Sequence, residues 1–98
     1  MNINIEKANG STVIKLEGRL DTTTAPELEN AIIAEGDELK NLVLDFKGVD
    51  YISSAGLRVL LSAQKKMNVQ GHMELINVGE AVMDVFEMTG FADILVIK

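Results

Sequence analysis

One stretch of the chain, residues 42–57 (LVLDFKGVDYISSAGL), decides the fold. Its apolar start, residues 42–44, is typical of a strand that is covered on both faces, so we expect this strand at the centre of a sheet. A helix is expected over residues 55–70, because apolar residues recur there at helical spacing. Ser53 and Ser54 therefore lie at a turn from strand to helix.

Two half-buried strands are predicted before the central strand. Residues 2–6 and residues 13–17 each alternate between apolar and mostly polar side chains, which is the period of a strand with one face on a core. Asn9 and Gly10 lie between them and tolerate the positive φ of a tight turn. We expect these two strands to form an antiparallel hairpin.

Two more helices are predicted on either side of the central strand and its helix. One should run from about residue 25 to Gly36 and another from about residue 80 to Gly90, each with apolar residues at helical spacing. Thr24 and Asn77 precede them with the spacing of N-terminal capping residues. The remaining strands are expected at residues 74–76 and 94–97.

Strands that alternate with helices after a hairpin predict the α/β class. We expect a mixed sheet of about five strands that begins with the antiparallel hairpin and is packed by three to four helices. No segment repeats and no linker interrupts the pattern. The length of 98 residues, with 47% hydrophobic residues, fits a single domain over residues 1–98.

Composition argues against several classes of function. The chain has no cysteine, so it has neither a disulfide framework nor a thiolate metal site. A net charge of −6, from 9 Lys and Arg against 15 Asp and Glu, disfavours binding to nucleic acid or anionic membranes. No apolar run approaches the ~18 residues of a membrane span, and the start lacks the pattern of a signal peptide. The sequence therefore predicts a soluble, cytoplasmic protein.

The predicted topology brings distant loops together. Each crossover from strand through helix to strand makes the two strands parallel, so their carboxyl ends meet at one edge of the sheet. Asp45 is expected to fix the turn after the central strand. The three loops expected at that edge carry Asp21, Thr22 and Thr23, then Asp50, Ser53 and Ser54, then Asn77 and Gly79. We predict one polar, acid-containing surface made from these loops.

Ser54 has two physical interpretations that position alone leaves open. It could be a helix N-cap, whose hydroxyl accepts a hydrogen bond from a backbone N–H. It could also accept a phosphate, because free N–H groups and the helix dipole favour negative charge there. A nucleophilic serine is disfavoured, because the only histidine, His72, follows the far end of the helix, ~20 Å away.

Four segments carry a resemblance to a known family. The most specific are residues 43–46 and 49–57, supported by residues 16–21 (LEGRLD) and 88–91 (MTGF). Together they resemble bacterial anti-sigma factor antagonists of the STAS domain family, over nearly the whole chain. The resemblance implies a STAS fold and a noncatalytic protein that uses no cofactor and no metal of its own.

The resemblance also implies a change of partner controlled by phosphorylation. In this family the serine two residues before a glycine is phosphorylated by a partner that is both an anti-sigma factor and a serine kinase, and here that position is Ser54. The unmodified antagonist binds the kinase and frees the sigma factor, phosphorylation breaks this pairing, and a metal-dependent phosphatase of the PP2C type restores it. Many members have Asp before the acceptor, where this chain has Ser53. Ser53 is therefore the second choice for modification.

Asp21 matches a family position beside the acceptor loop, so it could contact the kinase or cap the first helix. The neighbouring threonines favour capping chemistry. We expect the protein to be a monomer in isolation. The residues expected to contact the partner are Asp21, Thr22, Asp50, Ser53, Ser54 and Gly56.

One alternative belongs to another functional class. The chain could be a stand-alone STAS scaffold or a small-molecule-sensing module in a larger signalling assembly. Self-assembly into large particles, or saturable ligand binding without a kinase, would favour that alternative. A hydrolase at Ser54 comes third and would be excluded by the absence of labelling with a fluorophosphonate.

Overall fold

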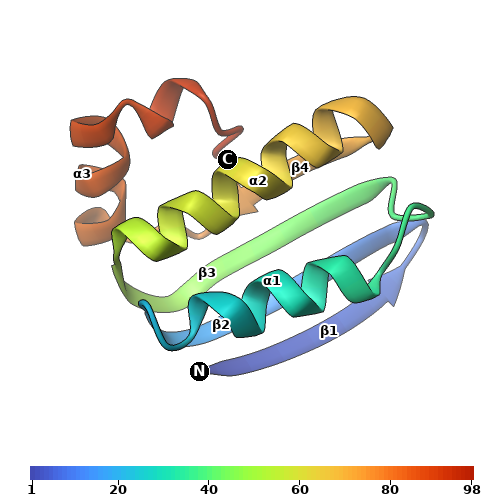
Figure 1. Cartoon of the computed structure of the whole chain (residues 1–98), viewed down its shortest axis with the longest axis horizontal. Coiled ribbons are helices and arrows are strands. Elements are labelled where there is room, and N and C mark those ends of the chain that lie inside the picture. The colour runs from blue at the N-terminus through green and yellow to red at the C-terminus, as the bar shows by residue number, and fades with distance from the viewer.

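The computed structural model describes all residues, 1–98, and builds them around one four-stranded sheet in the order β1-β2-β3-β4 (Figure 1). Three α-helices and one 3₁₀ turn complete the chain. In chain order the elements are β1 (Asn2–Ala8), β2 (Ser11–Leu20), α1 (Ala25–Ala34), β3 (Asn41–Ile52), α2 (Ser54–Gln70), β4 (His72–Ile76), α3 (Glu80–Thr89) and the 3₁₀ turn η1 (Phe91–Asp93).

The pairing of the strands confirms the predicted mixed sheet. β1 pairs with β2 in antiparallel register, and Asn9 and Gly10 turn the chain between them with φ of 53° and 79°. β2 pairs with β3 and β3 pairs with β4 in parallel, because α1 and α2 carry the chain back to the start of the sheet each time.

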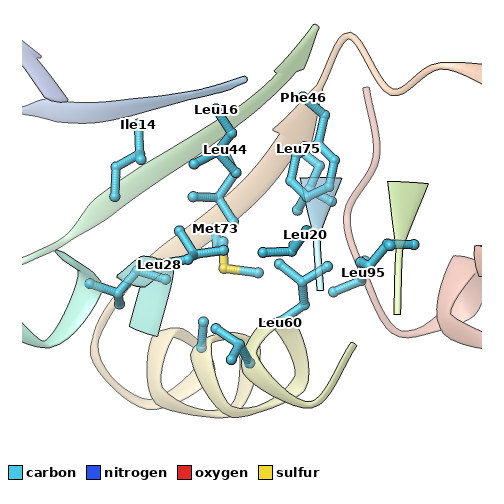
Figure 2. Packing of buried hydrophobic residues seen from close by; sticks show 14 of the residues in the cluster. Ile14, Leu16, Leu20, Leu28, Leu44, Phe46, Leu60, Met73, Leu75 and Leu95 are labelled. Atoms are coloured by element: carbon cyan, nitrogen blue, oxygen red, sulfur yellow. The ribbon is translucent and has the colours of Figure 1, made fainter. Parts of the chain in front are cut away.

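Both crossover helices lie on one face of the sheet (Figure 1). The inward side chains of β2, β3 and β4, such as Ile14, Leu44 and Leu75, are fully buried against Leu28 of α1 and Leu60 of α2 (Figure 2). The core cluster contains 22 buried residues, so the helices and the sheet share one continuous apolar interior. The opposite face of the sheet carries polar side chains that remain exposed.

The predicted fifth strand is wrong. Residues 94–97 form a single bridge between Leu75 and Ile97. Gly90, with φ of 82°, turns the chain into η1, and Leu95 is then buried in the core, so only the last residues run alongside β4. The backbone N–H of Leu75 donates to the carbonyl of Val96 at 2.9 Å, and this contact still covers the β4 edge of the sheet.

Of the two predicted capping residues, one lies at the predicted position and one does not. Thr24 occupies the N-cap of α1, but its side chain makes no cap hydrogen bond. Gly79, not Asn77, occupies the N-cap of α3. Asn77 instead donates from its side-chain amide to Asp45 at 3.1 Å, and Asp45 also accepts the backbone N–H of Lys47 at 3.0 Å. Asp45 thus fixes the chain locally, but the turn predicted after it is wrong, because β3 continues through Gly48 to Ile52.

No helix of the structure combines the length and the apolar character needed to cross a membrane.

Candidate functional site

Two of the three predicted loops meet at the carboxyl ends of β2 and β3. Leu20 and Ile52 are register partners at those ends, and the backbone N–H of Ser53 donates to the carbonyl of Leu20 at 2.9 Å. The loop that begins with Asp21 therefore lies beside the turn that carries Ser53 and Ser54.

The third predicted loop lies elsewhere. β4 has 5 residues against 12 in β3, and its last residue, Ile76, pairs with Asp45. Ile52 lies seven positions further along β3, which corresponds to about 20 Å of strand. The rest of β3 packs against α3, where the rings of Phe46 and Phe86 have centroids 6.3 Å apart. The expectation of one surface made from three loops is wrong because β4 is short.

Two irregularities in β3 shape the loop that carries the serines. Opposite the stretch from Lys15 to Glu17 of β2, β3 has one residue more than β2. The same happens opposite the step from Gly18 to Arg19, where Asp50 is the extra residue of β3. Extra residues of this kind bend a strand and re-aim the side chains beyond them. The second irregularity leaves Asp50 exposed and without a register partner on β2.

The two serines differ sharply in accessibility. Ser53 occupies the N-cap of α2, with φ of −100° and ψ of 176°, and its side chain makes no cap hydrogen bond. The Ser53 hydroxyl oxygen is buried and has no hydrogen-bond partner. Ser54 is the first residue of α2 and is exposed. The N-cap interpretation of Ser54 is therefore wrong, and Ser54 is the hydroxyl that an incoming group can reach.

Gly56, one of the predicted partner contacts, has no side chain that could contact a partner, but it positions this turn. It is buried on the inner face of α2. A Cβ at this position would lie 2.8 Å from Cγ of Leu20 and 2.9 Å from Cγ1 of Ile52, which is closer than real Cβ contacts. Only glycine lets the first turn of α2 rest directly on the ends of β2 and β3.

Asp21 organises the loop between β2 and α1. Its Oδ1 accepts hydrogen bonds from the Thr23 hydroxyl at 2.8 Å, from the Thr23 backbone N–H at 3.0 Å and from the Thr24 backbone N–H at 3.1 Å. The Thr24 hydroxyl donates to the carbonyl of Arg19 at 2.6 Å and accepts from the N–H of Asp21 at 2.8 Å. The bond from the Thr23 hydroxyl, together with the backbone N–H groups, holds the pKa of Asp21 below its ordinary value. Hydrogen bonds within the loop therefore occupy one oxygen of Asp21, and Thr22 is left exposed on the loop.

Two residues beside this loop are absent from the predicted set. Arg19 and Tyr51 are register partners one position before Leu20 and Ile52. The guanidinium carbon of Arg19 lies 4.0 Å from the centroid of the Tyr51 ring, and Arg19 Nε lies 3.8 Å from Oδ2 of Asp21. A regular parallel pairing of β2 and β3 would have allowed this pair to be predicted. The two extra residues of β3 shift the pairing, and the sequence does not reveal them.

The one histidine of the chain lies far from Ser54. His72 begins β4 and pairs with Asn41, the first residue of β3, whereas Ser54 lies two positions beyond Ile52, the last residue of β3. The structure contains no cluster of three or more His, Cys, Asp or Glu side chains suited to a metal ion. What the site provides is an exposed hydroxyl at a helix N-terminus, between an organised acidic loop and the bulge at Asp50.

The largest hollow lies on the open face of the sheet, away from Ser54. Its volume is about 770 Å³, and Asn2, Lys15, Glu17, Asp45 and Asn77 are among its lining residues. Two pairs of these side chains are hydrogen-bonded, Asn2 to Glu17 at 3.0 Å and Asn77 to Asp45 at 3.1 Å. Only one of the lining residues is hydrophobic, whereas small-molecule sites are mostly apolar.

Comparisons with known proteins point to one family. The family model described as STAS domain matches residues 2–98. The Bordetella bronchiseptica protein BtrV, provisionally described as an anti-sigma factor antagonist, is 38% identical over 96 residues that cover 96% of this chain and 83% of that protein. The anti-sigma-B factor antagonist of Bacillus subtilis is 31% identical over 98 residues that cover 97% and 90%. The solved structure of an anti-sigma factor antagonist from Mycobacterium paratuberculosis superposes with a TM-score of 0.89 at 28% identity, covering 98% of this chain and 83% of that one.

Proposed function

Because the chain belongs to the STAS domain family, we propose that it is an anti-sigma factor antagonist whose pairing with an anti-sigma factor is switched by phosphorylation of Ser54. The relatives named as such antagonists support the role. The observation that carries the site assignment is the contrast between the exposed Ser54 and the buried Ser53 hydroxyl.

The proposed partner is an anti-sigma factor that is also a serine kinase, with a PP2C-type phosphatase as the opposing enzyme. ATP and metal ions are used by those enzymes. The domain itself acts through residues 1–98 as one unit and performs no catalysis, because no histidine lies near Ser54 to activate its hydroxyl. We expect it to work in the cytoplasm, where transcription takes place.

Phosphorylation would change the surface and leave the fold intact. A phosphate adds about 1.5 to 2 negative charges at neutral pH. At the first residue of α2 it meets a helix N-terminus whose N-cap side chain supplies no hydrogen bond, so the charge is tolerated there. Asp21 and Asp50 border the same turn and add negative charge to it.

The kinase would therefore face a dianion where it had accommodated a neutral hydroxyl. Desolvating that charge opposes binding, and repulsion from any acidic group of the partner adds to the effect. A hundredfold loss of affinity requires only about 2.7 kcal/mol. One phosphate is thus sufficient to separate the pair without remodelling the domain.

The alternative of a ligand-sensing module receives less support. The largest hollow lies on the open face, and only one of its lining residues is hydrophobic, whereas small-molecule sites are mostly apolar. We therefore place the switch at Ser54.

The proposal is tested by incubating the protein with ATP, Mg²⁺ and the ATPase-type kinase of the same cell and mapping the phosphate by mass spectrometry. We expect one phosphate on Ser54, none on Ser54→Ala, and normal modification of the control Ser62→Ala, which removes another exposed serine of α2. Ser54→Glu should bind the kinase at least tenfold more weakly than the unmodified protein.

Two results would contradict the proposal in different ways. Phosphate on Ser53 alone would refute the assignment of the site to Ser54, but it would leave the proposed switch by phosphorylation intact. No modification of Ser54, combined with unchanged kinase binding by Ser54→Glu, would overturn the switch itself.

A further inference from the structure

An exposed arginine lies over a tyrosine ring beside the proposed phosphorylation site. The guanidinium carbon of Arg19 lies 4.0 Å from the centroid of the Tyr51 ring, which is the geometry of a cation–π contact. Its Nε lies 3.8 Å from Oδ2 of Asp21. Both side chains remain exposed, and Tyr51 retains 41% of its surface. The arrangement therefore adds little to the buried core.

The hydrogen-bonding groups of this pair are free. The Asp21 ion pair is too long for a hydrogen bond, and the guanidinium, which lies over the Tyr51 ring, makes no hydrogen bond within the chain. Because the stack and the ion pair restrict the side chain, binding would cost less rotamer freedom than for an ordinary surface arginine. A planar, oriented guanidinium is suited to a carboxylate, which can accept two of its N–H bonds.

The pair adjoins the proposed contact surface directly. Arg19 and Tyr51 are register partners, and the next partners along the strands are Leu20 and Ile52, after which Ser53 bonds back to Leu20. Leu20 and Ile52 point into the core, so Arg19 and Tyr51 lie on the open face of the sheet. A protein that covers Ser54 at the strand ends can therefore reach the pair by extending around that edge.

We propose that Arg19, oriented by Tyr51, is a specificity-determining contact for the anti-sigma factor kinase and pairs with a carboxylate of that partner. Arginine and tyrosine are among the residues that most often dominate the energy of protein interfaces. The inference rests on the proposed function, because it takes the kinase at Ser54 as the occupant.

The test is the dissociation constant of the unphosphorylated protein and the kinase, measured by calorimetry with ADP present. We expect Arg19→Ala to weaken binding by roughly tenfold or more, since a paired guanidinium supplies charge-assisted hydrogen bonds. Arg19→Lys should recover only part of the affinity, because an ammonium lacks the fork. Tyr51→Leu should weaken binding and Tyr51→Phe should not, since the stack needs only the ring.

Lys15→Ala provides the matched control. Lys15 is an exposed cation on the same strand and the same face, and its nearest acid is Glu6, at 3.3 Å. Its removal should change the dissociation constant less than twofold. The two residues act as one unit, so their effects should not add. The dissociation constant of the double variant Arg19→Ala with Tyr51→Leu should therefore lie within about twofold of that of Arg19→Ala alone.

The failure of this inference is distinguishable from the failure of the proposed function. If Ser54→Glu abolishes binding while Arg19→Ala behaves like Lys15→Ala, the Arg19 contact is refuted and the switch stands. If the unmodified protein neither binds the kinase nor accepts phosphate, the proposed function falls and this inference falls with it.

Discussion

The substitution Gly56→Ala tests how tightly the phosphorylation turn is seated on the sheet. The new Cβ would lie 2.8 Å from Cγ of Leu20, 3.1 Å from Cδ2 of the same residue and 2.9 Å from Cγ1 of Ile52. Leu20 is fully buried and Ile52 is 5% exposed, so neither side chain can move into solvent. The first turn of α2 must therefore shift, or the core around it must repack.

Two opposing free energies decide the sign of the effect. Alanine is favoured over glycine inside a helix by about 1 kcal/mol. Overpacking a filled core costs about 1 to 3 kcal/mol. With three contacts at or below 3.1 Å, we expect the clash to prevail, with a net loss of about 1 kcal/mol of unfolding free energy. For a domain of this size that lowers Tm by about 4–8 °C.

The assay is thermal unfolding followed by circular dichroism, with Ser62→Ala as the control. Ser62 is an exposed residue of the same helix, so its substitution meets no buried side chain. This control should change the unfolding free energy by no more than about 0.5 kcal/mol. Gly56→Ala should also be phosphorylated more slowly, because Ser54 moves with the shifted turn.

A Tm of Gly56→Ala equal to or above that of the unchanged protein would refute this reasoning. Helix preference would then outweigh the contacts with Leu20 and Ile52, and Gly56 would have no positioning role.

Asp21→Asn should make the unfolding free energy less dependent on pH in the acid range. The pKa of Asp21 is lower in the folded protein than in the unfolded chain, where it is near ~3.9. The ionised Asp21 therefore contributes stability that is present above the unfolded pKa and is lost as pH falls through the folded pKa. Urea unfolding between pH 2.5 and 6 measures this, and a pH dependence of the unfolding free energy that is identical in both proteins would contradict it. Ser53→Ala should leave the unfolding free energy unchanged or raise it by up to about 1 kcal/mol, because it removes a buried hydroxyl without a partner. It should keep phosphorylation at Ser54, and a loss of 1 kcal/mol or more would instead reveal a working N-cap.

Local sequence patterns predict much of this fold. The alternation of residues 2–6 and 13–17, with Asn9 and Gly10 between them, predicts the hairpin that β1 and β2 form. Helical spacing predicts α1, α2 and α3 to within a few residues, because the buried face of a helix recurs within a few positions of sequence. Position in the chain also predicts that Asp21, Ser53 and Ser54 share one edge of the sheet.

Capping and the last strand are misjudged from sequence because each depends on a competitor elsewhere in the fold. Asn77 has the spacing of a helix N-cap residue, but its side-chain amide donates a hydrogen bond to Asp45, 32 positions away. Residues 94–97 have the composition of a strand, but burial of Leu95 leaves a single bridge to β4. Short-range spacing carries no information about such distant partners.

By itself the sequence determines the α/β class, the hairpin, the helices and the serine turn, because these follow from the period of apolar residues and from turn chemistry. Only the tertiary structure decides which hydroxyl is accessible, since Ser53 and Ser54 are chemically identical neighbours that differ in what covers them. It also decides that Asn77 lies away from the site and that Arg19 stacks on Tyr51. These features depend on strand length and on the irregular register of β3, which are set by packing across the whole sheet.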